Sequence, residues 1–302
     1  MSKTLIIDGG LGRMICAIPA LEKFVKTNQN SIIISYYWTS IFWGNPILTN
    51  CIFDSGTKGL FERIKNTKII KPEPYYNNDY LNEKISLATS FNREINNDDE
   101  DMTSSKIYLS NYELKMGRDY IRKDDRKVVV FQPFGSTAEI SDNDVCDPSS
   151  RSLSKDAVLK IVKNLISNNI HVVIFDNRIL PFLYNLAHNI TFFHNNDIRF
   201  ASSIIANSDF FIGVDSCGQH IARSFDIPGT VFIGSTSAIN CSYPDFFNII
   251  EKKSDNKQYS SYRICEFDYW LSNINNSNLM DYSDDELNNV CEMLLKDIKS
   301  KT

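Results

Sequence analysis

The sequence predicts an α/β protein made of two doubly wound, Rossmann-like domains, at residues 1–125 and 126–302, with a helix at the C-terminus. Short apolar strands alternate with helical patterns in both halves of the chain, which is typical of parallel sheets with crossover helices. The 302 residues are also long for one hydrophobic core and sufficient for two. A charged run, Arg122–Arg126, lies just before the second strong strand and is the expected linker.

The first domain is expected to begin with a strand at Thr4–Ile7, which a glycine-rich turn connects to a helix. The apolar residues of that helix recur at the spacing of one buried face; they are Ile15, Ile18, Leu21 and Val25. Ser31–Tyr36 and Cys51–Phe53 are predicted to be the next strands. From residue 73 to 125 the chain is polar and helical in places.

The second domain is expected to begin with the strand Val128–Phe131, and a helix should open near Ser154. Four further elements are predicted, namely the strand His171–Phe175, the helix Phe200–Ala206, and the strands Phe210–Val214 and Thr230–Ile233. Residues 283–286 (Ser-Asp-Asp-Glu) fit a capping box. The C-terminal helix that follows should bury Leu287, Val290, Leu294 and Ile298.

Composition excludes several classes of protein. No apolar run approaches the length of a membrane span, and residues 1–3 lead straight into a strand, which argues against a signal peptide. The seven cysteines include no C-x-x-C pair and the four histidines no H-x-x-x-H pair, so neither a disulfide framework nor a built-in metal site is expected. Scattered cysteines indicate reduced thiols in the cytoplasm. The net charge of −5 carries no general signature of nucleic-acid binding.

The segment Phe210–His220 is the most informative one in the chain. A buried apolar strand ends in Asp215-Ser216, and a helical pattern follows directly. A helix N-terminus carries partial positive charge and unsatisfied N–H groups, which suits a phosphate. The alternative is ordinary N-capping of the helix by Asp or Ser.

Three strand ends carry the residues that indicate chemistry, at Gly9–Arg13, Gln132–Thr137 and Asp215–His220. Ligands of doubly wound folds bind at the carboxyl ends of parallel strands. Two such sheets facing each other would place the three segments around one cleft.

The glycine-rich segment lacks Cβ atoms at Gly9, Gly10 and Gly12, so a ligand or another backbone can approach closely. It does not fit the dinucleotide-binding fingerprint, because residues 35–37 (Ser-Tyr-Tyr) offer no acidic side chain for a ribose at the end of the second strand. A nicotinamide-dependent dehydrogenase is therefore not expected.

Taken together, these motifs resemble those of the ADP-heptose:lipopolysaccharide heptosyltransferase family. The opening strand, Gly-Gly-x-Gly turn and Pro-Ala-Leu helix are similar to the family's N-terminus, and Ile212-Gly-Val-Asp-Ser-Cys-Gly-Gln-His220 is similar to its "GVDTGPMH" motif. The segments that carry the resemblance follow in the family's order, at Leu5–Leu21, Asn45–Phe53, Phe131–Ser136 and Ile212–Thr236.

The resemblance implies a GT-B glycosyltransferase, with two Rossmann-like domains facing a central cleft. It implies an inverting reaction without an obligatory metal or any cofactor besides the nucleotide-diphosphate sugar, which is a co-substrate. In this family the N-terminal domain holds the acceptor and the C-terminal domain holds the sugar nucleotide. A hexosyl- or pentosyltransferase is therefore expected.

By position, the resemblance assigns donor binding to Ser136, Thr137, Arg151, Asp215, Ser216, Cys217, Gly218 and His220. The residues at 136 and 137 would meet a phosphate or the sugar, Asp215 would meet the sugar or orient its loop, and the N–H groups of residues 216–218 would face the diphosphate. His220 would face either the phosphate or the core. Arg151 is either a diphosphate ligand or an ordinary surface residue.

One departure from the family concerns the catalytic base. The family's usual Asp after Gly-Gly-x-Gly, where it is the general base, is replaced by Arg13, which cannot accept a proton at neutral pH. Asp8 is the nearest carboxylate in sequence, and it either takes over as the base or holds the glycine-rich turn. Arg13 would instead bind an acceptor phosphate or stabilise the leaving diphosphate.

Three functions follow as alternatives. The acceptor is either a saccharide or a hydroxymethylated DNA base of the phage type; a flipped-out base would stack on Trp38, Phe42 or Trp43 unless these are core residues. The basic and aromatic stretch Lys58–Tyr76 suits a phosphate-bearing acceptor or is simply a solvated face. The third alternative is a non-catalytic protein that binds a sugar nucleotide, because the family's base is missing.

Overall fold

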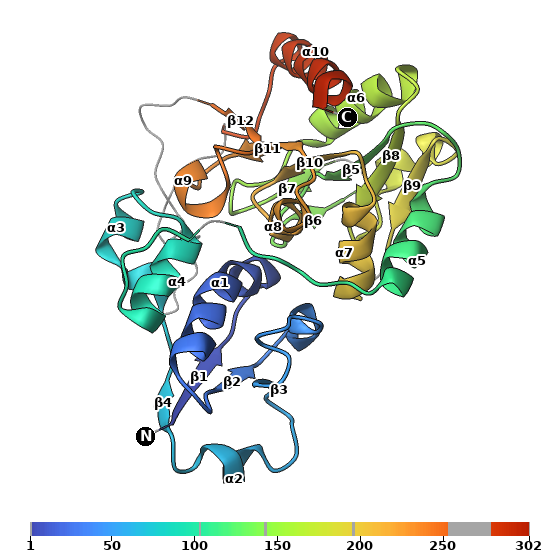
Figure 1. The fold of residues 1–302 in the computed structure, drawn as a ribbon. Coiled ribbons are helices and arrows are strands. Elements are labelled where there is room, and N and C mark those ends of the chain that lie inside the picture. Colours follow the sequence, from blue (N-terminus) through green and yellow to red (C-terminus); the bar gives the residue numbers. More distant parts are fainter. Residues whose placement is uncertain (1, 103, 142–143, 195–196, 253–278, 302) are drawn as a thin grey trace. The chain divides into compact units, whose positions relative to one another are not determined.

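The computed structural model describes residues 2–102, 104–141, 144–194, 197–252 and 279–301. The chain forms two compact units, Met1–Asn111 and Tyr112–Thr302 (Figure 1). The division between the units precedes the charged linker expected at residues 122–126. It lies there because the helix α5 (Asn111–Ile121) packs on the second unit.

The first unit contains a parallel sheet of four strands in the order β3-β2-β1-β4. The strands are β1 (Lys3–Ile7), β2 (Ile32–Ser35), β3 (Ile52–Asp54) and β4 (Lys68–Ile70). β1, β2 and β3 confirm the three strands predicted for this half. β4 was missed, because it is a short edge strand with two exposed residues and no apolar alternation.

The helix α1 (Leu11–Thr27) follows β1 and buries the predicted apolar face, including Ile15, Ile18 and Leu21. It packs against α4 (Leu87–Asn96), and Asn96 Nδ2 donates to the carbonyl oxygen of Ala20 at 3.0 Å. The shorter helical elements are η1 (Thr39–Phe42), α2 (Leu60–Ile64), η2 (Pro74–Tyr76) and α3 (Asn78–Leu81).

The second unit contains a parallel sheet of six strands in the order β12-β11-β10-β5-β8-β9. The strands are β5 (Val128–Gln132), β8 (His171–Phe175), β9 (Ile190–Phe193), β10 (Phe210–Val214), β11 (Gly229–Ile233) and β12 (Asn248–Glu251). Every residue of β5, β8, β10 and β11 is buried, because helices cover both faces of the sheet. These four were predicted, whereas the outer strands β9 and β12 were not. A short hairpin, β6 (Glu139–Ile140) and β7 (Val145–Cys146), lies beside the sheet.

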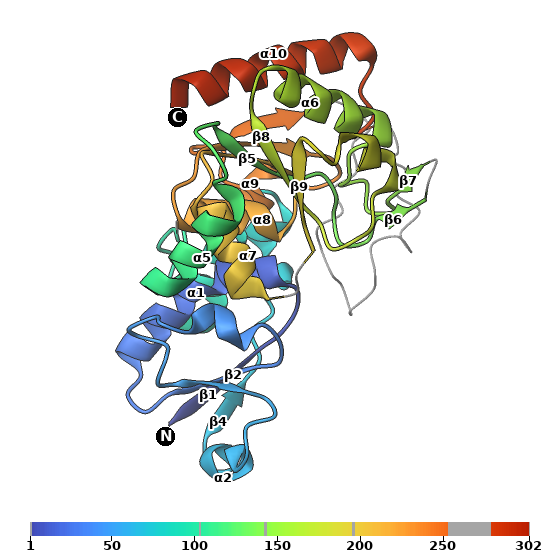
Figure 2. The ribbon, with the colours of Figure 1, turned by 90° about the vertical axis from the view of Figure 1, so that its right-hand side faces the viewer.

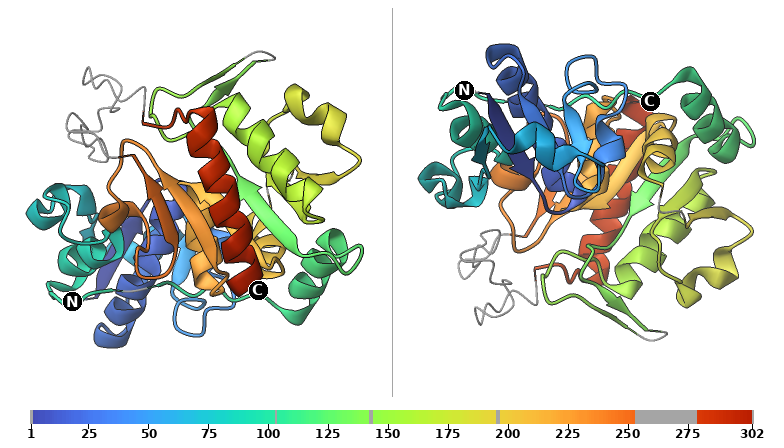
Figure 3. Two further views of the ribbon diagram at one scale, coloured as in Figure 1. Left: turned by 90° about the horizontal axis from the view of Figure 1, so that it is seen from above. Right: turned by 90° about the horizontal axis from the view of Figure 1, so that it is seen from below.

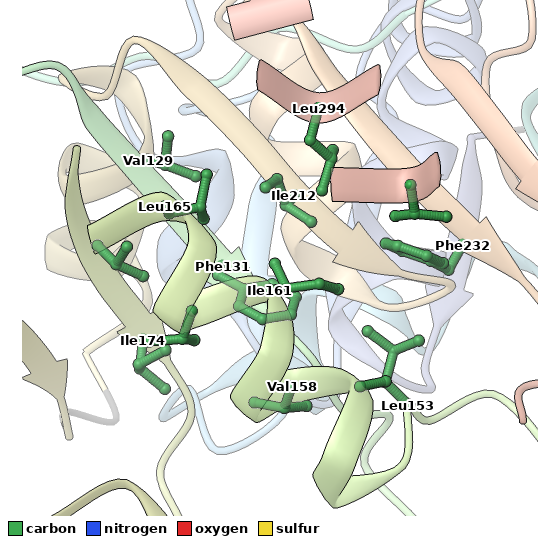
Figure 4. Packing of buried hydrophobic residues seen from close by; sticks show 14 of the residues in the cluster. Val129, Phe131, Leu153, Val158, Ile161, Leu165, Ile174, Ile212, Phe232 and Leu294 are labelled. Carbon is green, nitrogen blue, oxygen red and sulfur yellow. The ribbon is translucent and has the colours of Figure 1, made fainter. Parts of the chain in front are cut away.

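Two helices, α6 (Lys155–Ser167) and α10 (Asp284–Lys301), cover one face of this sheet, and α7 (Ile198–Ala206) and α8 (Cys217–Ser224) cover the other (Figures 2 and 3). The remaining helices are η3 (Pro181–Leu186) and α9 (Ala238–Cys241). Figure 4 shows Ile161 and Leu165 of α6 and Leu294 of α10 packed over Phe131 and Ile212 of the strands. This interdigitated layer is the hydrophobic core of the second unit.

Two predicted helix starts are confirmed. Ser154 Oγ accepts the N–H of Ala157 at 3.3 Å at the start of α6. At the start of α10 the capping box forms in both directions, since Glu286 Oε2 accepts the Ser283 N–H at 2.6 Å and Ser283 Oγ accepts the Glu286 N–H at 3.3 Å. Within the described ranges, no helix combines the length and apolarity that crossing a membrane requires.

The helix α5 belongs to the second unit through its side chains. The Tyr120 ring lies edge-on to Phe193 and Phe200, and its hydroxyl donates to the carbonyl oxygen of Phe192 at 3.0 Å. Glu113 pairs with Arg199 of α7 at 2.5 Å. These contacts explain why the chain divides before α5.

Candidate functional site

The glycine-rich turn of the first unit, residues 8–10, wraps around Arg13 in the first turn of α1. Gly10 is the N-cap of α1 and Gly12 lies inside the helix. Gly9 has a φ of +105°, and a Cβ at this position would lie 2.8 Å from Arg13 Cδ. Glycine is therefore required at position 9 both by the backbone conformation and by the close approach of Arg13.

Arg13 is buried, with 8% of its surface exposed, and two carboxylates face its guanidinium. Nη1 donates to Glu73 Oε1 at 3.1 Å, and Nη2 donates to Glu73 Oε2 and to the Pro72 carbonyl oxygen, both at 3.4 Å. Nη2 also lies 3.6 Å from Asp8 Oδ1. A buried guanidinium needs such counterions, because leaving its charge uncompensated is costly.

Aromatic rings complete the surroundings of Arg13. Its guanidinium carbon lies 4.9 Å from the ring centroid of Tyr75 and 5.5 Å from that of Phe91, within the range of cation–π contacts. Burial alone would lower the pKa of Arg13, but attraction from Tyr75, Glu73 and Asp8 outweighs it and raises that pKa above its ordinary value. Arg13 is therefore a permanent cation whose charge is compensated inside the first unit.

Glu73 is a functional candidate that the sequence did not reveal. The register of the sheet pairs Leu5 with Ile70, so residues 71–73 lie beside the end of β1. There Lys71 Nζ lies 2.9 Å from Asp8 Oδ2, and the carboxylates of Asp8 and Glu73 are 30% and 31% exposed. The alternating charges of Lys71-Pro72-Glu73 were the available signal, but they point to this site only once β4 is recognised as a strand.

In the second unit, Gln132 at the end of β5 fastens the turn between β10 and α8. Its Oε1 accepts the N–H of Gly218 at 2.9 Å, and its Nε2 donates to Ser216 Oγ at 3.2 Å. A Cβ on Gly218 would lie 2.4 Å from Gln132 Oε1, so glycine is needed there. The Gly218 N–H, expected to face a diphosphate, is thus engaged by a side chain of its own unit, and Cys217 Sγ lies 3.8 Å from Gln132 Nε2.

Asp215, at the end of β10, is 7% exposed and lies among polar groups. Gln219 Nε2 donates to Asp215 Oδ1 at 3.2 Å, and Arg151 Nη1 lies 3.9 Å from Asp215 Oδ2 and 3.5 Å from its carbonyl oxygen. Arg151 therefore lies beside the turn that precedes α8.

Asp147 organises the loop after β5, and it is a second functional candidate that the sequence did not reveal. Asp147 Oδ1 accepts from Thr137 Oγ1 at 2.7 Å and from the Ser149 N–H at 2.9 Å, and Oδ2 accepts from Ser152 Oγ at 2.5 Å. Burial would raise the pKa of Asp147, but the hydrogen bonds from Ser149, Ser152 and Thr137 outweigh it and hold that pKa below its ordinary value. Arg151 joins this network by donating from Nε to Ser149 Oγ at 3.0 Å.

Ser136 and Thr137 consequently differ in their hydrogen bonding and exposure. The Thr137 hydroxyl is engaged by Asp147, whereas Ser136 is exposed at the tip of the same loop. The structure thus brings the loop after β5 and the turn after β10 together through Arg151, which contacts both.

His220 lies in the packed interior of the second unit, 6% exposed. Its Nδ1 lies 2.9 Å from the Tyr243 hydroxyl, and the two rings meet edge to face. Burial lowers the pKa of His220 to about 4, with Asp215 acting in the opposite direction. A neutral histidine with these contacts corresponds to the core alternative rather than to a phosphate ligand.

The three aromatic residues considered for stacking on a DNA base differ in their exposure. Phe42 is fully buried and belongs to the core of the first unit, whereas Trp38 and Trp43 are 42% and 57% exposed. Of these three residues, only the two tryptophans are exposed enough to contact a ligand.

Comparisons with known proteins give a consistent result for the fold. Neither a protein-family model nor a curated protein matches the sequence. Among solved structures, the iron-containing dodecameric glycosyltransferase TibC from enterotoxigenic E. coli is similar over 98% of this chain and 76% of its own, with a TM-score of 0.69 and 14% identity. The family 9 glycosyl transferase from Veillonella parvula covers 98% of this chain and 97% of its own, with a TM-score of 0.66 and 11% identity.

A third solved structure, the ADP-heptose lipopolysaccharide heptosyltransferase II of E. coli, covers 98% of this chain and 99% of its own, with a TM-score of 0.56 and 10% identity. The chain has the GT-B fold of the heptosyltransferases. The resemblance inferred from the sequence motifs is thereby confirmed in the fold. On this fold, the Arg13 cluster belongs to the first Rossmann-like unit and the Asp215 turn to the second.

Proposed function

We propose that this chain is a glycosyltransferase, which moves a sugar from a nucleotide-diphosphate sugar to an acceptor hydroxyl with inversion at the sugar C1 and without a metal. The observation that carries this proposal is the turn from β10 to α8, on a GT-B fold, with Arg151 beside it. A helix N-terminus and a guanidinium at one strand end are the groups that a diphosphate requires.

The donor contacts are proposed to come from the second unit. Arg151, 21% exposed, would bind the diphosphate, and the N-terminal turn of α8 would add its partial positive charge. Ser136 would contact a phosphate or the sugar, Asp215 would contact the sugar or orient its loop, and Thr137 would support the loop after β5 through Asp147. Since TibC has been solved with ADP-D-β-D-heptose, an ADP-sugar is the first donor to test.

The reaction needs one base and one stabilised leaving group. Asp8, at the carboxyl end of β1, is proposed to take the proton of the acceptor hydroxyl as the oxygen attacks C1 of the sugar. The bond from C1 to the diphosphate oxygen breaks, and its electron pair leaves with the diphosphate. Arg151 and the α8 N-terminus would stabilise the negative charge that develops there.

The acceptor is proposed to be a saccharide. The basic stretch that could favour DNA is partly compensated within its own unit, since Lys65 pairs with Glu62 at 2.5 Å and Lys71 with Asp8 at 2.9 Å. Arg63 lies over the Phe53 ring, with its guanidinium carbon 4.9 Å from the ring centroid. These contacts reduce the positive charge that the stretch offers to a phosphate backbone, whose binding requires several cations.

The experiment is a screen of ADP-, UDP- and GDP-sugars against oligosaccharides, with and without phosphate, and against duplex DNA that contains hydroxymethylcytosine. Release of nucleotide and mass gain of the acceptor are measured together. Transfer to DNA would replace the saccharide acceptor by the alternative. Donor binding without turnover of any pair would favour the non-catalytic protein and refute the proposed activity.

A further inference from the structure

Arg13 is shared unequally between its two carboxylates. Glu73 takes both terminal nitrogens, at 3.1 and 3.4 Å, whereas Asp8 Oδ1 lies 3.6 Å from Nη2. The first two distances are within hydrogen-bonding range, and the last is outside it. Glu73 is therefore the main counterion of Arg13, and Asp8 interacts with it only through space.

The charges around Asp8 come from three elements. Arg13 lies beside it from α1 and Lys71 from the segment after β4, and Glu73 of that segment and Tyr75 of η2 contact Arg13 in turn. Lys71 occupies Oδ2 at 2.9 Å. Because Glu73 holds the guanidinium, the lone pairs of Asp8 Oδ1 are left for the proton of a hydroxyl.

We propose that Glu73 is a positioning residue for glycosyl transfer, which holds Arg13 out of hydrogen-bonding range of Asp8 Oδ1 and so preserves Asp8 as the proton acceptor. This inference rests on the proposed function. In the step concerned, the acceptor O–H proton passes to Asp8 Oδ1 while the oxygen bonds to C1 of the sugar. The C1–O bond to the diphosphate breaks, and the electron pair departs with the nucleotide diphosphate.

Removing the charge of Glu73 leaves a buried cation with Asp8 as its remaining carboxylate partner. Arg13 is then expected to close the gap from 3.6 Å and to form a direct hydrogen bond with Asp8 Oδ1. Asp8 would then be present but hydrogen-bonded to Arg13, and so less able to accept a proton. Glu73→Gln should therefore lower kcat by about 10- to 100-fold, up to the lower end of the range for a lost general base, with KM for the donor unchanged.

The decisive measurement is suppression by a second substitution. In Arg13→Met/Glu73→Gln no guanidinium remains to occupy Asp8, and a neutral pair replaces an ion pair, which buried sites often tolerate. The double variant should thus be about 10-fold more active than Glu73→Gln alone, recovering most of the effect of blocking the base. Asp8→Asn should be inactive in every background.

Glu62→Gln is the matched control, because Glu62 also pairs with a cation of the first unit but is 66% exposed. It should retain the kcat of the wild-type chain. Glu73→Asp keeps the charge and withdraws the carboxylate from Arg13, so its kcat should lie between those of the wild-type chain and Glu73→Gln. If the Gln variant is unstable, the comparison is made with Glu73→Asp instead. All variants are measured by nucleotide release with the donor–acceptor pair found in the screen, and with ADP-heptose and water.

The outcomes distinguish a failure of the proposed function from a failure of the proposed role of Glu73. A wild-type chain that turns over no pair removes the proposed function and this role with it. An active wild-type chain with Glu73→Gln and Glu73→Asp equally active removes only the role of Glu73. A double variant whose kcat per folded enzyme is no higher than that of Glu73→Gln also overturns it, because a purely structural role changes the amount of folded enzyme and not its kcat.

Discussion

Acidification is expected to destabilise the second unit through His220. The folded chain holds this side chain neutral, since burial lowers its pKa from 6.5 to about 4. The unfolded chain binds the proton near pH 6.5, so the unfolded state gains protons first as the pH falls. The contribution of neutral His220 to stability is therefore complete above pH 6.5 and is lost between about pH 6.5 and about pH 4.

The size of the loss follows from the shift. A change from 6.5 to about 4 corresponds, at about 1.4 kcal/mol per unit, to about 3 kcal/mol over that window. This is a substantial part of the stability of a typical domain, which is about 5–15 kcal/mol. The transition of the second unit should consequently move to clearly lower urea concentration at pH 4.5 than at pH 7.

The assay is urea unfolding at pH 7, 5.5 and 4.5, followed by circular dichroism, for the wild-type chain, His220→Gln and His188→Gln. Glutamine does not titrate, so His220→Gln should lose stability at pH 7 but show a flatter pH dependence. His188 is exposed, and its replacement should reproduce the wild-type slope. Equal slopes for His220→Gln and the wild-type chain would refute the assignment of the loss to this buried ring.

Three further substitutions, with Lys65→Met as a control, test the Arg13 cluster and the Asp215 turn. Arg13→Met should lower the free energy of unfolding by about 3 kcal/mol, the lower end for breaking a buried pair, because its carboxylate partners are partly exposed. Lys65→Met, at an exposed pair, should lower it by less than about 1 kcal/mol. The midpoints of urea unfolding measure both losses. Gly218→Ala, whose Cβ would lie 2.4 Å from Gln132 Oε1, should cost about 1–3 kcal/mol by overpacking, and an unchanged midpoint would contradict the geometry. Arg151→Ala should weaken binding of ADP by about 10- to 100-fold, the loss expected for a charge-assisted hydrogen bond, and titration calorimetry would show it.

In the sheet of the second unit, the sequence predicts the strands whose residues are all buried and misses the two outer ones, β9 and β12. The run Phe210–Val214 is recovered with its full bounds, because a short continuous apolar stretch is typical of a strand buried on both faces. Lys68–Ile70 is the opposite case, since none of its three residues is fully buried and it carries no apolar periodicity. Missing that strand also concealed Glu73, whose position beside Asp8 depends on its register.

The candidate site, like the fold, could be predicted from the sequence only in part. The backbone turn at Asp215-Ser216 follows from a strand that ends before a helix, and it is present as predicted. The engagement of the Gly218 N–H by Gln132 was not predictable, because it depends on the register that pairs Gly213 with Gln132. Local pattern locates a turn, but the side chains that occupy it come from strands remote in sequence.

Position 13 shows why a buried cation requires carboxylates beside it. A cation in the first turn of α1 lies at the positive end of the helix dipole, which opposes it by about 0.3–1 kcal/mol. Burial adds a larger penalty, so Arg13 can persist only with carboxylates close by. Asp8 and Glu73 would therefore be needed for folding even in a chain without activity. Loss of activity on replacing either one does not by itself identify a catalytic group. Recovery of kcat per folded enzyme in Arg13→Met/Glu73→Gln does, because restored folding changes the amount of active enzyme and not its kcat.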